Sequence, residues 1–146
     1  MSTPESDILD HGTMELRVRY NECDPMGVAH HSRFPVWFEM GRTELLRATG
    51  WTYRQFEEEG VFLAVIDLAI KYRKPARYDD LLMLHTSIEG GSRVKIKHSY
   101  QLKHGEDLLA TGRSTLACLT RSGEVQPIPD LLMKLITATE AKSLSQ

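Results

Sequence analysis

Apolar and polar side chains alternate along residues 14–20, which predicts a strand with one buried face. Further along the chain the same two-residue period recurs, interrupted by turn-forming residues such as Gly90-Gly91 and Gly105. The alternating stretches there are residues 66–72, 82–88, 94–102 and 108–120. Because consecutive strands with tight connections pair antiparallel, this pattern predicts an antiparallel sheet.

A helical period of apolar residues over 34–48 predicts one long helix with a buried face. Ser32 is the expected N-cap of this helix, and Gly50 is its expected stop signal. Gly41 lies in the middle of the helix, where glycine costs about 1 kcal/mol relative to alanine. Its presence there predicts that another backbone segment passes close to the helix.

Two shorter helices are expected over residues 52–59, which open with a capping pattern of Thr52 and Gln55, and over residues 131–139. The long helix can bury its apolar face only against the sheet. We therefore expect an α+β fold in which an antiparallel β-sheet wraps around one long central α-helix. The expected organisation is a flexible N-terminal tail over 1–13, a single domain over 14–138 and a C-terminal tail over 139–146.

Composition narrows the class of protein. The chain has 146 residues, of which 41% are hydrophobic and 26% charged, as in soluble globular domains. A net charge of -2 argues against nucleic acid as a partner, and no apolar run reaches the length of an integral membrane segment. Without a secretory signal, Cys23 and Cys118 are expected to be free thiols in the cytoplasm.

An open antiparallel sheet has exposed edges, and long exposed edges invite pairing with another chain. Sheet extension across a subunit boundary is a simple way to cover such an edge. We therefore expect a homodimer, or a homotetramer built from dimers.

The polar residues that carry chemistry are concentrated in the loop before the long helix. Asp24 lies seven residues before His31, which stands at the entrance to that helix. The first turn of a helix offers unpaired N–H groups and a partial positive charge, which can polarise a carbonyl or hold an oxyanion. A carboxylate beside such donors can act as a base or as a nucleophile, so the arrangement suits acyl transfer to water.

The same loop resembles the hotdog-fold acyl-CoA thioesterases, most of all the 4-hydroxybenzoyl-CoA thioesterase type and its Tol-Pal-associated relatives. The resemblance covers about residues 14–136. The main motif is Tyr20-x-Glu22-x-Asp24-x-x-Gly27-Val28-x-x-His31-x-x-Phe34. Supporting matches are Trp37-Phe38-Glu39, Arg42-Thr43-Glu44, Tyr72-x-x-Pro75-Ala76, Asp79-Asp80 and Pro127-Ile128-Pro129.

This resemblance implies hydrolysis of an acyl-CoA to a free acid and CoA, with water as co-substrate and no metal or other cofactor. Asp24 matches the catalytic carboxylate, which attacks the thioester carbonyl or activates water. His31 matches the position whose backbone N–H polarises the carbonyl, and in some relatives its side chain assists. Tyr20 matches a tyrosine of the site in some relatives, whereas Phe34 stands where many relatives have tyrosine.

Further residues are expected to bind the substrate. Gly27, Val28 and Phe34 lie in the motif and are assigned to substrate binding. Arg73 and Arg93 belong to a basic cluster on the middle strands that is either a solvated sheet face or a site for the CoA phosphates, which this family often binds across a subunit boundary. The acyl group is expected in the apolar space between the long helix and its neighbours.

Other interpretations of these residues stay open. Asp24 before Pro25 can be a plain turn residue, and Tyr20 can be a strand residue with its ring in the core. Cys23 with a histidine base is a conceivable nucleophile, and the Cys and His spacing matches no standard zinc pattern. Alternative functions are a non-catalytic acyl-CoA sensor or scaffold and a hotdog hydratase or dehydratase.

Overall fold

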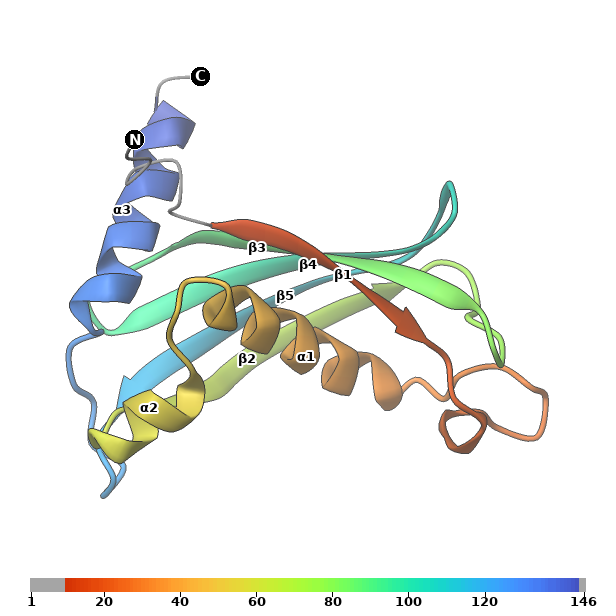
Figure 1. Ribbon diagram of the computed structural model, residues 1–146, viewed down its shortest axis with the longest axis horizontal. Helices are drawn as coiled ribbons and strands as arrows, with labels where there is room; N and C mark the ends of the chain where they lie inside the picture. Colours follow the sequence, from red (N-terminus) through yellow and green to blue (C-terminus); the bar gives the residue numbers. More distant parts are fainter. Residues whose placement is uncertain (1–9, 145–146) are drawn as a thin grey trace.

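The computed structural model describes residues 10–144, within which five strands form one antiparallel sheet (Figure 1). The strands are β1 (His11–Arg17), β2 (Phe62–Tyr72), β3 (Leu81–Gly91), β4 (Lys95–His104) and β5 (Asp107–Leu119). Their order across the sheet is β1-β3-β4-β5-β2, so β1 and β2 form the two edges. The α+β prediction of a sheet wrapped around one long helix is confirmed.

Helix α1 (Arg33–Arg47) lies across one face of the sheet and supplies the centre of the core (Figure 1). Phe38 is completely buried and stacks on Tyr100 of β4, with 4.4 Å between the ring centroids. Gly112 of β5 makes room for this ring, because a Cβ there would lie 2.4 Å from Phe38 Cε2. The register of the sheet therefore places a glycine directly under the Phe38 ring.

Gly41 of α1 is also required by packing, although not for the predicted reason. A Cβ at Gly41 would meet the side chains of Thr86 and Leu84 on β3, at 2.4 Å from Oγ1 and 2.6 Å from Cδ2. The close neighbours are side chains of the sheet, so the prediction of a passing backbone segment is wrong.

Helices α2 (Tyr53–Glu58) and α3 (Asp130–Leu144) lie at the opposite end of the sheet from the loop that precedes α1, and α3, with 15 residues, is longer than the predicted helix over 131–139 (Figure 1). Helix α2 begins with the predicted capping box, in which Thr52 Oγ1 accepts from the Gln55 N–H and Gln55 Oε1 accepts from the Thr52 N–H. Helix α3 packs against β3. Asp10 joins α3 to the sheet, because its carboxylate accepts from Thr139 Oγ1 and Lys142 Nζ.

The predicted domain boundaries are too narrow. Strand β1 begins at His11, which pairs with Ser87, and α3 continues to Leu144 because the contacts to Asp10 hold its last turns. The residues of the predicted tails within 10–13 and 139–144 therefore belong to the folded domain. The rest of those tails, residues 1–9 and 145–146, lies outside the described residues.

Two more observations concern the cysteines and the length of the helices. Cys23 and Cys118 are both free, as predicted. No helix within residues 10–144 is both long and apolar enough to cross a membrane.

Candidate active site

Asp24 is held in a tight turn that its own side chain stabilises. Its Oδ1 accepts from the main-chain N–H of Met26 at 2.9 Å and of Val28 at 3.4 Å, while its carbonyl accepts from the Gly27 N–H at 2.9 Å. Gly27 has a φ of 79°, a left-handed conformation that glycine adopts without strain. Oδ2 accepts no hydrogen bond from the described residues, so half of this carboxylate stays available for chemistry.

Backbone contacts hold the Asp24 turn in place. Cys23 pairs with Ala29 in an isolated bridge, and Val28 pairs with Arg77. The Ala29 N–H donates to the Ala76 carbonyl at 2.7 Å. These contacts fasten the turn to the segment between β2 and β3, so the Asp24 carboxylate has a fixed frame.

The other half of the site is the beginning of α1. The His31 N–H donates to no described group, and the carbonyl of His31 accepts from Tyr72 Oη at 2.8 Å. Ser32 occupies the N-cap position, but its hydroxyl bonds His30 Nδ1 at 2.8 Å and caps no helix N–H. Ser32 is therefore the N-cap residue, as predicted, although its side chain makes no capping hydrogen bond. Tyr72, the last residue of β2, holds the helix entrance instead.

The His31 imidazole is exposed and lies against the ring of His30, with 4.1 Å between the centroids. Its neighbour Tyr72 is partly desolvated, and burial raises the pKa of this phenol above its ordinary value. Tyr72 therefore stays protonated at neutral pH and keeps its donor hydrogen bond to the His31 carbonyl.

Glu22 is a buried residue of the loop to which the sequence analysis assigned no role. Its Oε2 accepts from the indole N–H of Trp37 at 2.8 Å, and its Oε1 accepts from the Arg19 N–H at 2.7 Å. The guanidinium of Arg19 lies 3.7 Å from the same carboxylate. Glu22 thus connects the loop to the buried face of α1, two residues before Asp24. The helical period that places Trp37 inward was the available signal, because a buried indole N–H needs an acceptor.

The remaining predicted residues fall into two groups. Phe34 is buried beneath the helix entrance and contacts Tyr72, with 4.9 Å between the ring centroids. Arg73 directly follows Tyr72 and is exposed at the same end of the sheet. Arg93 lies in the turn between β3 and β4, at the opposite end of the sheet, so only another subunit could bring an Arg93 to this site.

Tyr20 lies neither in a strand nor in the core. Strand β1 ends at Arg17, and Tyr20 opens the short 3-10 helix η1 (Tyr20–Glu22). Its ring is exposed and contacts the ring of Tyr78 edge-on, with 5.5 Å between the centroids. The strand interpretation is wrong, because Tyr20 lies in η1 beyond the end of β1 and its ring faces solvent.

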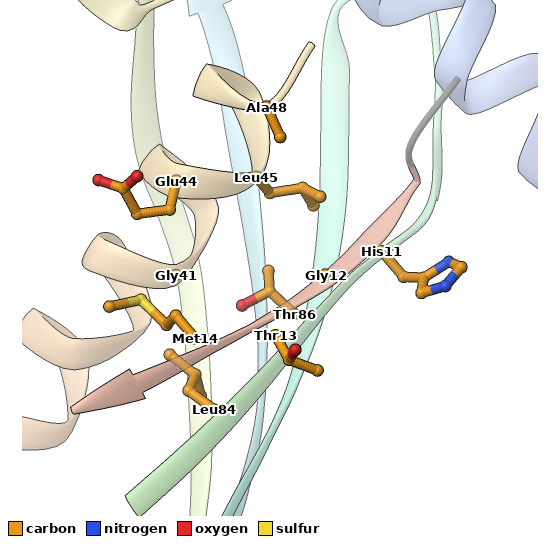
Figure 2. Close-up of a pocket in the computed structure, with 10 residues that line it drawn as sticks. All are labelled: His11, Gly12, Thr13, Met14, Gly41, Glu44, Leu45, Ala48, Leu84 and Thr86. Carbon is orange, nitrogen blue, oxygen red and sulfur yellow. The ribbon is translucent and has the colours of Figure 1, made fainter. Parts of the chain in front are cut away.

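A separate hollow of about 90 Å³ lies between the C-terminal half of α1 and strands β1 and β3 (Figure 2). Gly12 and Met14 line it from β1, and Gly41 and Leu45 line it from α1. Gly41 is eight residues past the first residue of α1, which corresponds to about 12 Å along a helix. The buried side chains of Trp37 and its neighbours occupy that interval, so the hollow is not part of the Asp24 site.

Among residues 10–144, no three His, Cys, Asp or Glu side chains gather in a group that could hold a metal ion. The site offers instead the Asp24 carboxylate, which accepts hydrogen bonds, and the main-chain N–H of His31, which can donate one. Such groups can hold a carbonyl and supply a nucleophile or a base that acts on it.

Comparison with known proteins assigns the chain to a class. Residues 18–136 match the Thioesterase-like superfamily, which is most of the chain. The protein therefore belongs to this superfamily, and the predicted class of enzyme, a thioester hydrolase, is confirmed.

Individual relatives agree with this assignment. The chain is 32% identical over 123 residues to the acyl-CoA thioesterase YbgC of Haemophilus influenzae, covering 83% of this chain and 90% of that protein. It is 39% identical over 88 residues to YneP of Bacillus subtilis, where the match spans 60% of this chain and 64% of that protein.

Solved structures give the same fold. The DHNA-CoA thioesterase of Staphylococcus aureus superposes with a TM-score of 0.86 at 26% identity, over 92% of this chain and 94% of that one. A 4-hydroxybenzoyl-CoA thioesterase in complex with 4-hydroxybenzoyl-CoA superposes with a TM-score of 0.77, over 87% of this chain and 99% of that one. The second pair is 20% identical, so it supports the hotdog fold alone.

Proposed function

We propose that this protein hydrolyses an acyl-CoA thioester and that Asp24 is its catalytic carboxylate. The observation that carries the proposal is that Asp24 Oδ2 and the His31 N–H both lack a hydrogen-bond partner among residues 10–144, while the segments that hold them are joined by the hydrogen bond from the His30 N–H to the Glu22 carbonyl. The relatives named as acyl-CoA thioesterases support the choice of CoA as the carrier.

The chemistry needs only these two groups and water. The His31 N–H donates a hydrogen bond to the thioester oxygen and stabilises the negative charge that develops there as the carbonyl carbon becomes tetrahedral. In one route Asp24 takes a proton from water while the water oxygen attacks. In the other route Asp24 Oδ2 attacks first, and water then hydrolyses the resulting anhydride. In both routes the C–S bond breaks, CoA leaves as a thiolate that takes up a proton, and the acid is released.

The inner face of β2 is the proposed binding surface for the acyl group. Tyr72, Ile70 and Leu68 pair with Ala110, Gly112 and Ser114 of β5, so they face the same side of the sheet as α1. Helix α1 packs on β1 and β3 and leaves these β2 side chains partly exposed. This apolar row begins at Tyr72, directly beside the His31 carbonyl, and so starts where the thioester would be held.

A homodimer would complete this acyl-binding surface. Strand β2 is an edge of the sheet and exposes Val65 and Ile66 along it. Unpaired edges of this kind favour pairing with a second sheet, and the second subunit would shield the acyl group from water. We expect sedimentation equilibrium to give a dimer or a multiple of it, and a monomer at micromolar concentration would contradict this assembly.

The decisive experiment is thiol release from a panel of aromatic and aliphatic acyl-CoAs by the wild type and by Asp24→Asn. Asparagine keeps an acceptor for the Met26 and Val28 N–H groups, so the turn should stay folded while the charge is lost. We expect kcat to fall by about 100-fold or more. Glu57→Gln on the exposed side of α2 serves as the matched control. Equal turnover by the wild type and Asp24→Asn would refute the role of Asp24.

A further inference from the structure

Large apolar side chains are exposed beside the Asp24 turn, which is unusual for residues with no packing role. The exposed fraction is 80% for Tyr20, 82% for Met26 and 53% for Tyr78. The two tyrosine rings meet edge-on, so their faces stay open to solvent. The backbone holds this group in place, because the Tyr78 N–H donates to the Gly27 carbonyl at 3.3 Å.

Two arginines flank this aromatic pair. Arg77 directly precedes Tyr78 and pairs through its backbone with Val28. Arg33 reaches across from the beginning of α1, and its guanidinium donates to the Asn21 carbonyl, one residue after Tyr20, at 3.4 Å. Neither guanidinium forms an ion pair with a carboxylate of the described residues, whereas the nearby Arg17 is paired with Asp79 at 3.6 Å. Arg77 and Arg33 therefore adjoin the aromatic pair without a salt bridge within residues 10–144, although Asp80 Oδ2 accepts from the Arg77 main-chain N–H.

We propose, on the basis of the function proposed above, that this surface binds the nucleotide end of CoA. The adenine would stack on Tyr20 and Tyr78, and the phosphates would pair with Arg77 and Arg33. Exposed aromatic rings bind any purine through its π-face, and guanidinium groups match phosphate oxygens in geometry and charge. The site thus differs from the basic sheet face considered in the sequence analysis, because Arg93 takes no part in it.

The position of the surface suits this end of the ligand. The acyl group needs an apolar surface shielded from water, whereas a nucleotide with three phosphates is best bound where its charges stay in contact with water. The surface adjoins the Asp24 turn through Gly27 and Val28, so one CoA molecule can hold its thioester at the turn while its flexible pantetheine arm folds back toward the tyrosines.

The test compares two substrates with the same acyl group, the acyl-CoA and the S-acyl-N-acetylcysteamine thioester, which lacks the nucleotide. The ratio of their kcat/KM values measures what the nucleotide contributes. We expect this ratio to fall about tenfold in Tyr78→Ala and in Arg77→Gln. Arg54→Gln, an exposed arginine on α2, and Val125→Ala, an exposed apolar residue, are the matched controls.

Calorimetry with adenosine 3′,5′-bisphosphate tests the same surface without turnover. We expect binding to the wild type and binding about tenfold weaker in both variants. An unchanged substrate ratio in folded variants would overturn the inference. So would an equal loss on both substrates, or a change of oligomeric state in Tyr78→Ala. If Asp24→Asn is fully active while the nucleotide still binds, the catalytic proposal fails and the nucleotide site stands.

Discussion

His98 makes the stability of this protein sensitive to acid. Its side chain projects from β4 into the core, where its Nδ1 has no partner among residues 10–144. Burial and the positive charge of Arg42 together lower the pKa of His98 from 6.5 to about 3. The folded protein therefore holds this imidazole neutral, while the unfolded chain protonates it below about pH 6.5.

The sign of the effect follows from this difference in pKa. Between the two pKa values the unfolded state binds one more proton than the folded state, so acid favours unfolding. Each pH unit in this window costs about 1.4 kcal/mol. At about pH 4.5 the loss relative to neutral pH is about 3 kcal/mol, a large share of the roughly 5–15 kcal/mol that stabilises a typical domain.

Replacing His98 with leucine should remove this dependence. Leucine fills a comparable space among the apolar neighbours of His98 and carries no group to protonate or to leave unpaired. The test measures the free energy of unfolding in urea at about pH 7.5 and about pH 4.5. Between these two values we expect it to decrease in both proteins, and the decrease should be about 3 kcal/mol smaller in His98→Leu than in the wild type. His104→Gln, which alters a partly exposed histidine, should keep the wild-type slope. The same pH slope in His98→Leu and the wild type would refute the reasoning.

Three further predictions concern the loop and the core. Glu22→Ala leaves the indole N–H of Trp37 buried without an acceptor, and urea unfolding should show a loss of about 3 kcal/mol; a loss below about 0.5 kcal/mol would contradict this. Gly112→Ala forces the Phe38 ring to move and should lower stability by about 1–3 kcal/mol in the same assay, with Phe38→Leu restoring part of it; a neutral substitution would show that the ring has room. His31→Ala keeps the main-chain N–H, so kcat should fall by less than about fivefold in the thiol-release assay; a 100-fold loss would assign the chemistry to the imidazole.

Local patterns were sufficient for much of the fold and for one part of the site. The alternation of residues 82–88 and 94–102 predicted paired strands, and both pair as expected in β3 and β4. The Thr52 and Gln55 capping box formed as predicted because its partners are only three residues apart. The spacing of Asp24 and Gly27 likewise defines a turn in which every bond is local.

Errors arose where a distant partner decides the outcome. The predicted domain start at residue 14 is too late because the partner of His11 is Ser87, far along the chain. Tyr20 continues an alternating pattern, but strand β1 ends at Arg17, and the loop that follows is fixed by the hydrogen bond between Glu22 and Trp37, which lie 15 residues apart.

The sequence by itself determined the order of the elements, the antiparallel sheet, the buried helix and the carboxylate before that helix, because each depends on residues within a few positions of one another. Only the tertiary structure decided that Tyr72 holds the helix entrance, that Glu22 is a buried acceptor, and that Tyr20 and Tyr78 form one exposed surface. These contacts join segments that are 15 to 58 residues apart, and no periodicity encodes which of many distant side chains will meet.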